Sequence, residues 1–347
     1  MGRRLSRYLS FVLLLLFCFF VASSAAAAGT GFSDVASNHW AAKHISKMNA
    51  LGIVKGYEDG TFRPDRTVKQ VEAVLMAARS VSKVMSYSTD IPFSVPEWAR
   101  QDVARALELG LLKSDEAFYA QADANRAWVV RLLVRLIGKE KEALNAEGLP
   151  AFTDSYLIPN WATGYVKVAQ DYNLVGGYAD NTFRPERAVT RAELAALLSR
   201  AQEYLEPSPL SIKGTVQEVS TSRLTISDSS GQKRTFILPY DTPIYDDSTL
   251  ISSSELWPYD RVLLITDGEN IKYIEKLSAE AVASVVSGSV RRVYSEEGAL
   301  VIETASGEYR TLYLPPESSL DTGSATWEVL HTLQPGDQVE VTLNNLG

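Results

Sequence analysis

Three expected helix starts carry side chains suited to anion binding. Arg126 and Arg191 each stand second in such a start, whereas Gln70 takes that place in the first, with Lys69 beside it. A guanidinium at a helix amino terminus can meet a carboxylate with two parallel hydrogen bonds, and the helix dipole adds attraction. The same arginine can instead pair with a carboxylate of the protein and only stabilise the fold. Residue type and spacing leave both roles open.

Aspartates and glycines accompany these starts. Asp34 and Asp154 lie shortly before expected helices, where a carboxylate either caps orphan amides or accepts hydrogen bonds from ligand hydroxyls. We expect capping. Gly177, like Gly56, allows a ligand to approach the backbone closely, but the geometry of a tight turn accounts for both glycines equally well.

Trp40, Trp98 and Trp161 open three similar segments at intervals of about 60 residues. Apolar residues five and eight positions later share a helical stripe, and glycine or asparagine follows where a helix can end in a left-handed conformation. Each segment is predicted to be a helix, a turn and a second helix, the second helices running over roughly 68–82, 125–137 and 190–204. Such short units cannot bury their apolar stripes alone, so three must pack together. The tryptophans can stack on a sugar, but we expect them in the core.

The turns and second-helix starts share a further pattern. It comprises Phe32, Asp34, Trp40, Gly52, Gly56, Gly60, Phe62 and Pro64 in the first segment, and Phe152, Asp154, Trp161, Gly177, Phe183, Pro185 and Thr190-Arg191-Ala192-Glu193 in the third. This combination resembles a set of three S-layer homology (SLH) repeats. The resemblance implies a pseudo-threefold helical bundle whose grooves bind secondary cell-wall polysaccharide, commonly with a pyruvyl ketal on N-acetylmannosamine. The ligand-binding residues that it implies are Asp34, Trp40, Lys69, Gln70, Arg126, Asp154, Trp161, Gly177 and Arg191.

The middle segment departs from this pattern. It has Phe93 but carries Val95 in place of the aspartate, lacks the glycine turn, and keeps only the arginine of the last motif. The first segment has Gln70 at the arginine position. We therefore expect two or at most three grooves to be charged for an anionic sugar, with unequal affinities.

The helical period ends at Glu206-Pro207-Ser208-Pro209, which is typical of a short stiff linker. Alternating residues then predict strands at 214–219, 224–226, 235–239 and 261–265, and again at 288–293, 300–302, 311–315 and 338–341. Matching Leu-x-Pro-x-Asp-x-Val segments at 256–262 and 333–339 predict turns closed by their aspartates. We expect two small barrel-like β modules with a spacer or protein-contact role. A sugar platform formed by Trp257, Tyr259 and Trp327 is the alternative.

Residues 1–28 are predicted to be a signal peptide, because three arginines precede an apolar run that ends in small residues at Ala26-Ala27-Ala28. Its removal leaves 31 basic and 42 acidic residues, a net charge of -11 that disfavours nucleic acid as a partner. The only cysteine, Cys18, is lost with it, which excludes disulfides and thiolate metal sites. No later apolar run is long enough to span a membrane.

Catalytic and metal motifs are missing. The sequence has no Gly-x-Ser-x-Gly elbow or phosphate loop, its Asp-Gly and Asp-Asn turns lack calcium ligands, and its three histidines are scattered. Only paired carboxylates brought together by the fold stay open.

These observations predict a multidomain α + β protein without catalysis, cofactor or metal. We expect SLH repeats over 29–90, 91–150 and 151–205, a linker over 206–211, and β modules over 212–278 and 286–347. The protein is expected to be secreted and held non-covalently at a bacterial cell wall by its polysaccharide, with other surface proteins as possible further partners. A wall-anchored carbohydrate-active enzyme and an S-layer lattice protein are the alternatives.

Overall fold

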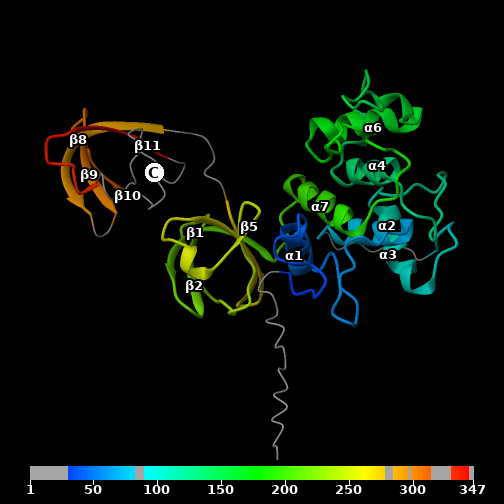
Figure 1. The fold of residues 1–347 in the computed structure, drawn as a ribbon, viewed down its shortest axis with the longest axis horizontal. Coiled ribbons are helices and arrows are strands. Elements are labelled where there is room, and N and C mark those ends of the chain that lie inside the picture. The colour runs from blue at the N-terminus through cyan, green and yellow to red at the C-terminus, as the bar shows by residue number, and fades with distance from the viewer. Residues whose placement is uncertain (1–29, 83–89, 278–283, 296–297, 314–329, 344–347) are drawn as a thin grey trace, which may run out of the picture.

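The computed structural model describes residues 30–82, 90–277, 284–295, 298–313 and 330–343. Helices fill the first part of the chain and strands the second, so the protein is a mixed α and β molecule with several domains (Figure 1). The predicted signal peptide and Trp327 lie outside the described residues. Among the helices that the model does describe, none is both long and apolar enough to cross a bilayer.

Three helix pairs form the helical half. They are α1 (Ala42–Ala50) with α2 (Gln70–Arg79), α3 (Arg100–Glu108) with α4 (Arg126–Leu136), and α6 (Asn160–Asp171) with α7 (Arg191–Ala201). The short helix α5 (Glu140–Leu144) lies between the second and third pairs, and the 3-10 turns are η1 (Glu97–Ala99), η2 (Ser155–Leu157) and η3 (Gln202–Tyr204). The first helix of each pair ends in a left-handed residue, as predicted: Gly52 at φ 71°, Gly110 at φ 70° and Asn173 at φ 53°.

A ring of backbone hydrogen bonds joins the three pairs just before their second helices. The amide of Val68 donates to the carbonyl of Val189 (3.0 Å), Val189 donates to Ala124 (2.9 Å), and Ala124 donates back to Val68 (2.9 Å). The isolated bridges Thr67↔Thr190, Lys69↔Asp123 and Asn125↔Ala188 belong to the same junction. The extended segment of each pair is thus paired with the segments of both other pairs.

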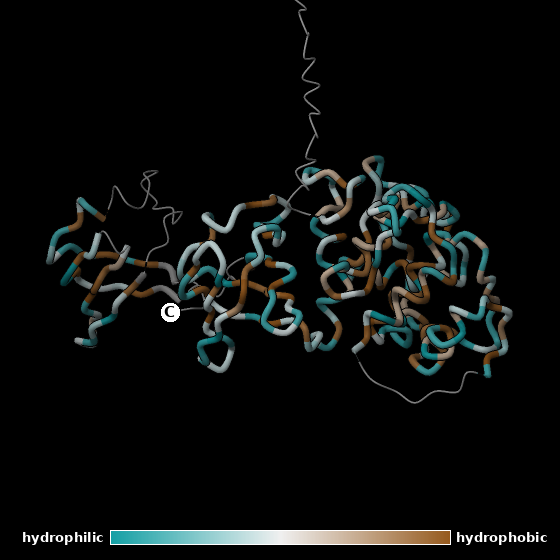
Figure 2. Tube along the Cα trace, turned by 90° about the horizontal axis from the view of Figure 1, so that it is seen from below, coloured by the Kyte–Doolittle hydropathy of each residue, from teal (hydrophilic) through white to brown (hydrophobic). Residues whose placement is uncertain are grey.

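One hydrophobic core runs through all three pairs. Each pair contributes two phenylalanines whose ring centroids lie close together: Phe32 and Phe62 at 5.3 Å, Phe93 and Phe118 at 5.2 Å, and Phe152 and Phe183 at 5.4 Å. Figure 2 shows the hydrophobic stretches gathered toward the inside of this half. The middle pair therefore has the same architecture as the outer two, although its turn sequence differs.

The strands form two sheets. Module 1 contains β1 (Ser211–Val219), β2 (Arg223–Asp228), β3 (Lys233–Ile237), β4 (Ile244–Asp246), β5 (Thr249–Ile251), β6 (Arg261–Asp267) and β7 (Asn270–Lys276), in the order β3-β2-β1-β6-β7-β4-β5. Module 2 contains β8 (Ser284–Tyr294), β9 (Ala299–Thr304), β10 (Tyr309–Tyr313) and β11 (Gln338–Leu343), in the order β10-β9-β8-β11. Each predicted strand has a counterpart, but residues 314–315 of the strand predicted over 311–315 lie outside the described residues. The strands β4, β5 and β7 were not expected. A single pairing, Ile237↔Asn270, also joins β3 to β7.

The two modules share details that support a duplicated unit. β1 and β8 each contain a register shift against the following strand, at Val216/Glu218 and at Val290/Arg292. Asp260 accepts the amide of Trp257 through Oδ2, and Asp337 accepts that of Gln334 in the same way, both at 2.8 Å. The prediction that these aspartates close matching turns is confirmed.

Candidate functional site

The first residue of each second helix reaches into the turn of another pair. Arg191 at the start of α7 donates from Nε to the carbonyl of Phe62 and from Nη2 to that of Lys55, both at 2.7 Å. The guanidinium carbon lies 4.4 Å from the Phe62 ring centroid and 5.0 Å from that of Tyr57. Only 5% of Arg191 is exposed. We call this contact the Arg191 site.

Arg126 at the start of α4 makes the equivalent contact with the third pair. Its Nη2 donates to the carbonyl of Gly176 at 2.8 Å, and its guanidinium faces the rings of Tyr178 and Phe183. Arg126 is 7% exposed, and its buried Nε has no hydrogen-bond partner. We call this contact the Arg126 site. The unpartnered Nε distinguishes it from the Arg191 site.

The third contact of this kind is neutral. The side-chain oxygen of Gln70, at the start of α2, accepts the amide of Tyr119 at 3.0 Å. Lys69 does not supply the missing charge, because its Nζ pairs with Asp123 at 2.8 Å on the surface. The structure thus brings two arginines and one glutamine to equivalent places.

The cations at the rims of the two arginine sites are paired with carboxylates, unlike the two central arginines. At the Arg126 site the rim residues Arg184 and Arg187 pair with Asp180 and Glu193, at 2.8 and 2.6 Å. The rim arginines Arg63 and Arg66 of the Arg191 site likewise pair with Asp59 and Glu72, both at 2.9 Å. Each rim cation therefore has its own carboxylate, whereas neither Arg126 nor Arg191 forms an ion pair with any described residue.

Burial acts on these two guanidinium groups directly. It lowers the pKa of Arg126 and that of Arg191, and the attraction of Tyr178 and Glu193, or of Tyr57 and Glu72, offsets only part of this effect. Arginine still stays protonated at neutral pH. A buried cation without an ionic partner is costly, and an anionic ligand would remove that cost.

Arg135 shows what a structural arginine looks like in the same bundle. Its guanidinium binds Glu116 and Glu140, the latter at 2.8 Å from Nε. Burial lowers the pKa of Arg135, but the two carboxylates outweigh it, so the pKa is raised. A structural role, in which an arginine pairs with carboxylates of the protein, therefore applies to Arg135 and not to Arg126 or Arg191.

Asp34 and Asp154 close turns rather than helices. Asp34 accepts the amides of Phe62 and Arg63, both at 2.7 Å, and Asp154 accepts those of Phe183 and Arg184 at 2.7 and 2.8 Å. The expectation that they cap helices is wrong, because the amides they bind belong to the turn about 30 residues later in the chain. By fixing these turns, the two aspartates hold the carbonyls and aromatic rings that surround Arg191 and Arg126.

The expected core position of the tryptophans is also wrong. Trp40, Trp98 and Trp161 are 58%, 63% and 45% exposed. Trp161 lies in α6, and the buried Val166 follows it by five residues, which turn a helix by about 500° and leave the tryptophan about 140° away from the buried stripe. Trp40 precedes α1, and Trp98 lies in the 3-10 turn η1 before α3. Arg131 of α4 lies over the Trp161 ring at 4.6 Å, so this indole is positioned beside the second pair.

The glycines of the turns are explained by packing. A Cβ on Gly177 would meet Asn181 at 3.1 to 3.3 Å, and one on Gly56 would collide with the Phe32 ring and with the Thr61 carbonyl at 2.8 Å. Tight-turn geometry therefore accounts for both residues. No group of metal-ligating side chains occurs among the described residues.

Sequence reasoning missed several neighbours of these sites. Arg131 follows Arg126 by five residues, but nothing in the sequence indicates that it lies on Trp161. The acceptors at Lys55, Phe62 and Gly176 are backbone carbonyls, which every residue has, so the sequence does not indicate which of them bind the arginines. The contacts of Tyr57 with Arg191 and of Tyr178 with Arg126 join distant segments, which the sequence does not reveal.

Comparisons with known proteins agree with this architecture. The S-layer homology domain model matches residues 31–74 and 151–195, which lie in the first and third helix pairs. The chain is 25% identical to S-layer protein EA1 of Bacillus anthracis over 59% of this chain and 26% of that protein. It is 30% identical to cell surface glycoprotein 1 of Acetivibrio thermocellus over 45% of this chain and 7% of that protein.

An enzyme also shares this region. An endoglucanase of a Bacillus species is 27% identical over 48% of this chain and 18% of its own length. The chain therefore spans about a quarter or less of the length of these curated relatives. Two SLH domains, together with relatives among S-layer proteins, indicate a secreted bacterial protein that is associated with the cell surface.

Proposed function

We propose that the protein is anchored non-covalently to an anionic secondary cell-wall polysaccharide through the Arg126 and Arg191 sites. The observation that carries this proposal is the pair of buried guanidinium groups without an ionic partner, at equivalent places in a bundle with two SLH domains. A ligand carboxylate would supply the missing charge. A pyruvyl ketal on N-acetylmannosamine has such a carboxylate fixed beside sugar hydroxyls.

The hydrogen bonds already present restrict how this carboxylate would bind. Nε and Nη2 of Arg191 donate to backbone carbonyls, and Nη2 of Arg126 does the same. Nη1 of both arginines has no partner among the described residues, so the ligand would approach the Nη1 side. The exposed tryptophans would offer flat surfaces to neighbouring sugars.

The middle pair is part of this proposal as a degenerate third repeat. It supplies Arg126, and its turn meets the neutral Gln70. We assign strong binding to the two arginine sites and weak or no anion binding to Gln70. Module 1 would serve as an interaction domain and module 2 as a spacer or interaction domain, and we assign no catalytic activity to the chain.

Co-sedimentation with wall sacculi tests the proposal. The mature chain should sediment with sacculi and should lose most binding after mild acid removes the pyruvyl groups. The Arg126→Ala/Arg191→Ala double variant should bind weakly to untreated sacculi, whereas Arg100→Ala, which alters an exposed pair with Glu97, should bind normally. Equal sedimentation of the double variant and the wild type would refute the assignment.

A further inference from the structure

Module 1 is packed directly against helix α1. Tyr245, Ile265 and Tyr273 of this module are fully buried, and they contact Ala50 and Leu51 at the carboxyl end of α1. The hydroxyl of Tyr245 also lies 3.3 Å from that of Ser46. This apolar contact surface shows that the segment 206–211 does not hold the module away from the bundle, as a spacer would.

An ionic contact lies beside the apolar one. Glu275 of β7 binds Nζ of Lys43 at 2.8 Å and Nζ of Lys47 at 2.9 Å, and it also accepts the hydroxyl of Tyr273 at 3.3 Å. The lysines stand four residues apart, so both project from the same face of α1. Their side chains are only 19% and 13% exposed, and that of Glu275 only 13%. A single carboxylate thus joins two cations across the junction.

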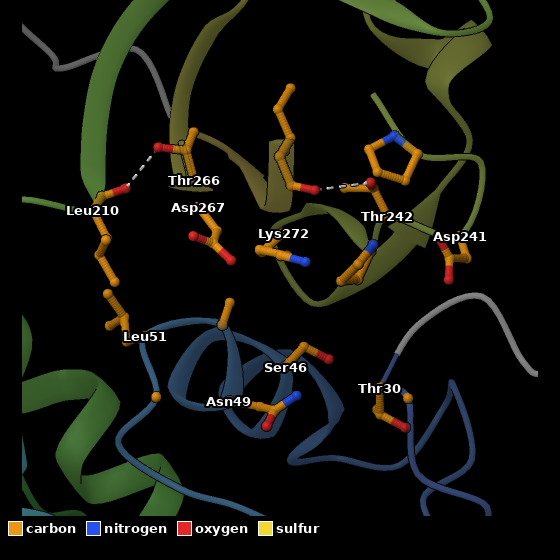
Figure 3. Close-up of a pocket in the computed structure, with 16 residues that line it drawn as sticks. Thr30, Ser46, Asn49, Leu51, Leu210, Asp241, Thr242, Thr266, Asp267 and Lys272 are labelled. Carbon is orange, nitrogen blue, oxygen red and sulfur yellow. Dashed lines mark hydrogen bonds between the residues drawn. The ribbon is translucent and has the colours of Figure 1, made fainter. Parts of the chain in front are cut away.

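A cavity of about 580 Å³ adjoins this junction at the carboxyl end of α1. Its lining includes Asn49 and Leu51 from the bundle and Asp267 and Lys272 from the β6–β7 hairpin (Figure 3). Because this space is open, the end of α1 is supported by module 1 mainly through the apolar and ionic contacts. These contacts therefore decide how firmly the end of the helix is held.

The end of α1 leads directly to the Arg191 site. Leu51 is followed by Gly52 at φ 71°, and the amides of Ile53 and Val54 both donate to the carbonyl of Met48, at 3.0 and 3.3 Å. The next residue, Lys55, supplies the carbonyl that accepts Nη2 of Arg191. A shift of Leu51 is thus passed through a short, hydrogen-bonded segment to a group that holds the guanidinium.

We infer that module 1 is a positioning element of the wall-binding unit: the contact of Glu275 with Lys43 and Lys47, along one face of α1, fixes this helix and thereby orients Arg191 for its anionic ligand. The Arg126 site has no such connection, because its acceptor, Gly176, follows α6. This inference rests on the proposed function of the two arginine sites. It assigns to module 1 a role in affinity that a spacer does not have.

The test separates docking from binding. The mature chain lacks cysteine, so Glu147→Cys in the bundle and Lys233→Cys in module 1, both exposed positions, can carry spin labels whose distance distribution reports docking. Glu275→Lys should broaden this distribution. In an Arg126→Ala background, where only the Arg191 site is charged, it should also weaken binding of soluble pyruvylated wall polysaccharide by about fivefold. In an Arg191→Ala background it should leave affinity unchanged.

Two further variants complete the experiment. Glu303→Gln removes a pair with Arg291 in module 2 and should change neither readout. The charge swap Lys43→Glu/Lys47→Glu/Glu275→Lys should restore both, which distinguishes a lost contact from a damaged fold. A released module with unchanged affinity in the Arg126→Ala background would overturn the inference, as would a module that stays docked with Glu275→Lys. Absence of wild-type binding would refute the proposed function, while the distances would still report docking.

Discussion

Replacing His44 by leucine should remove a pH dependence from the stability of the protein. His44 lies in α1, between the bundle core and the junction with module 1, and its buried Nδ1 has no hydrogen-bond partner. Burial, together with the nearby Arg200, Lys43 and Lys47, lowers its pKa from 6.5 to about 4, against the opposing attraction of Glu275. The imidazole is therefore neutral in the folded protein at pH 5.

The sign and size follow from proton uptake. Between pH 6.5 and pH 4 the unfolded chain binds a proton at His44 that the folded chain does not, so stability falls as the pH falls. The contribution is fully present above pH 6.5 and lost near pH 4. A shift from 6.5 to about 4 corresponds to about 3 kcal/mol in total, of which about 2 kcal/mol is lost between pH 7 and pH 5.

Carboxylates act in a lower pH range. Burial raises the pKa of Glu275, but Lys47 and Lys43 outweigh it, so its pKa lies below 4.5. The pKa of Glu140 is about 2, because hydrogen bonds from Lys113, Tyr165 and Arg135 outweigh the effect of burial. The stability that such groups contribute is present above their unfolded pKa values and is lost only as the pH falls through the lower folded values. The change in the free energy of unfolding between pH 7 and pH 5 therefore comes from His44 and not from these carboxylates.

Urea unfolding of a chain of residues 29–347, followed by tryptophan fluorescence at several pH values from 7.5 to 5, measures this effect. The free energy of unfolding should fall by about 2 kcal/mol more in the wild type than in His44→Leu. His44→Gln, which keeps a polar side chain, should resemble His44→Leu in its pH dependence. A constant difference between wild type and both variants at every pH would refute the reasoning.

Three further predictions concern the sites and the turns. Arg191→Ala should weaken polysaccharide binding by about 1.5 to 3 kcal/mol, and Arg126→Ala by a similar amount. Gln70→Ala should weaken it by less than half of that, and titration calorimetry measures all three losses. Equal losses for the three variants would contradict the charge assignment. Gly56→Ala should destabilise the fold by about 1 to 3 kcal/mol, because its Cβ meets Phe32, while Gly176→Ala, with open space around it, serves as the control in thermal unfolding. Asp337→Ala should lower the stability of module 2 by about 1 kcal/mol and leave wall binding unchanged, and lost binding at unchanged stability would make this aspartate a ligand contact.

Local features were predictable from the sequence. Thr190 and Glu193, at one of the expected second-helix starts, form a capping box, and the aspartates of the two Leu-x-Pro-x-Asp-x-Val segments accept the expected turn amides. In each case the donor and acceptor lie within a few residues of each other. Short-range chemistry therefore identified both the helix starts and the duplicated β turn.

Features that depend on the packing of distant segments were not predictable in this way. Asp154 binds amides of a turn about 30 residues away, and the exposure of Trp161 depends on where the helix meets the rest of the bundle. Lys47 and Glu275 are separated by 228 residues and carry the most common kind of surface charge. Nothing in either residue distinguishes a contact between domains from an ordinary solvated side chain.

The ring formed by Val68, Ala124 and Val189 fixes the number of segments that meet at this junction. In a solenoid each unit contacts only its neighbours, so units can be added or removed at little cost. Here each amide of the ring needs a carbonyl from another segment, and three donors close on three acceptors. A chain with two units would leave one amide and one carbonyl unpaired, and a fourth unit would have no place to bond. The middle segment therefore completes the ring through Ala124, although Val95 stands where the other two segments have an aspartate.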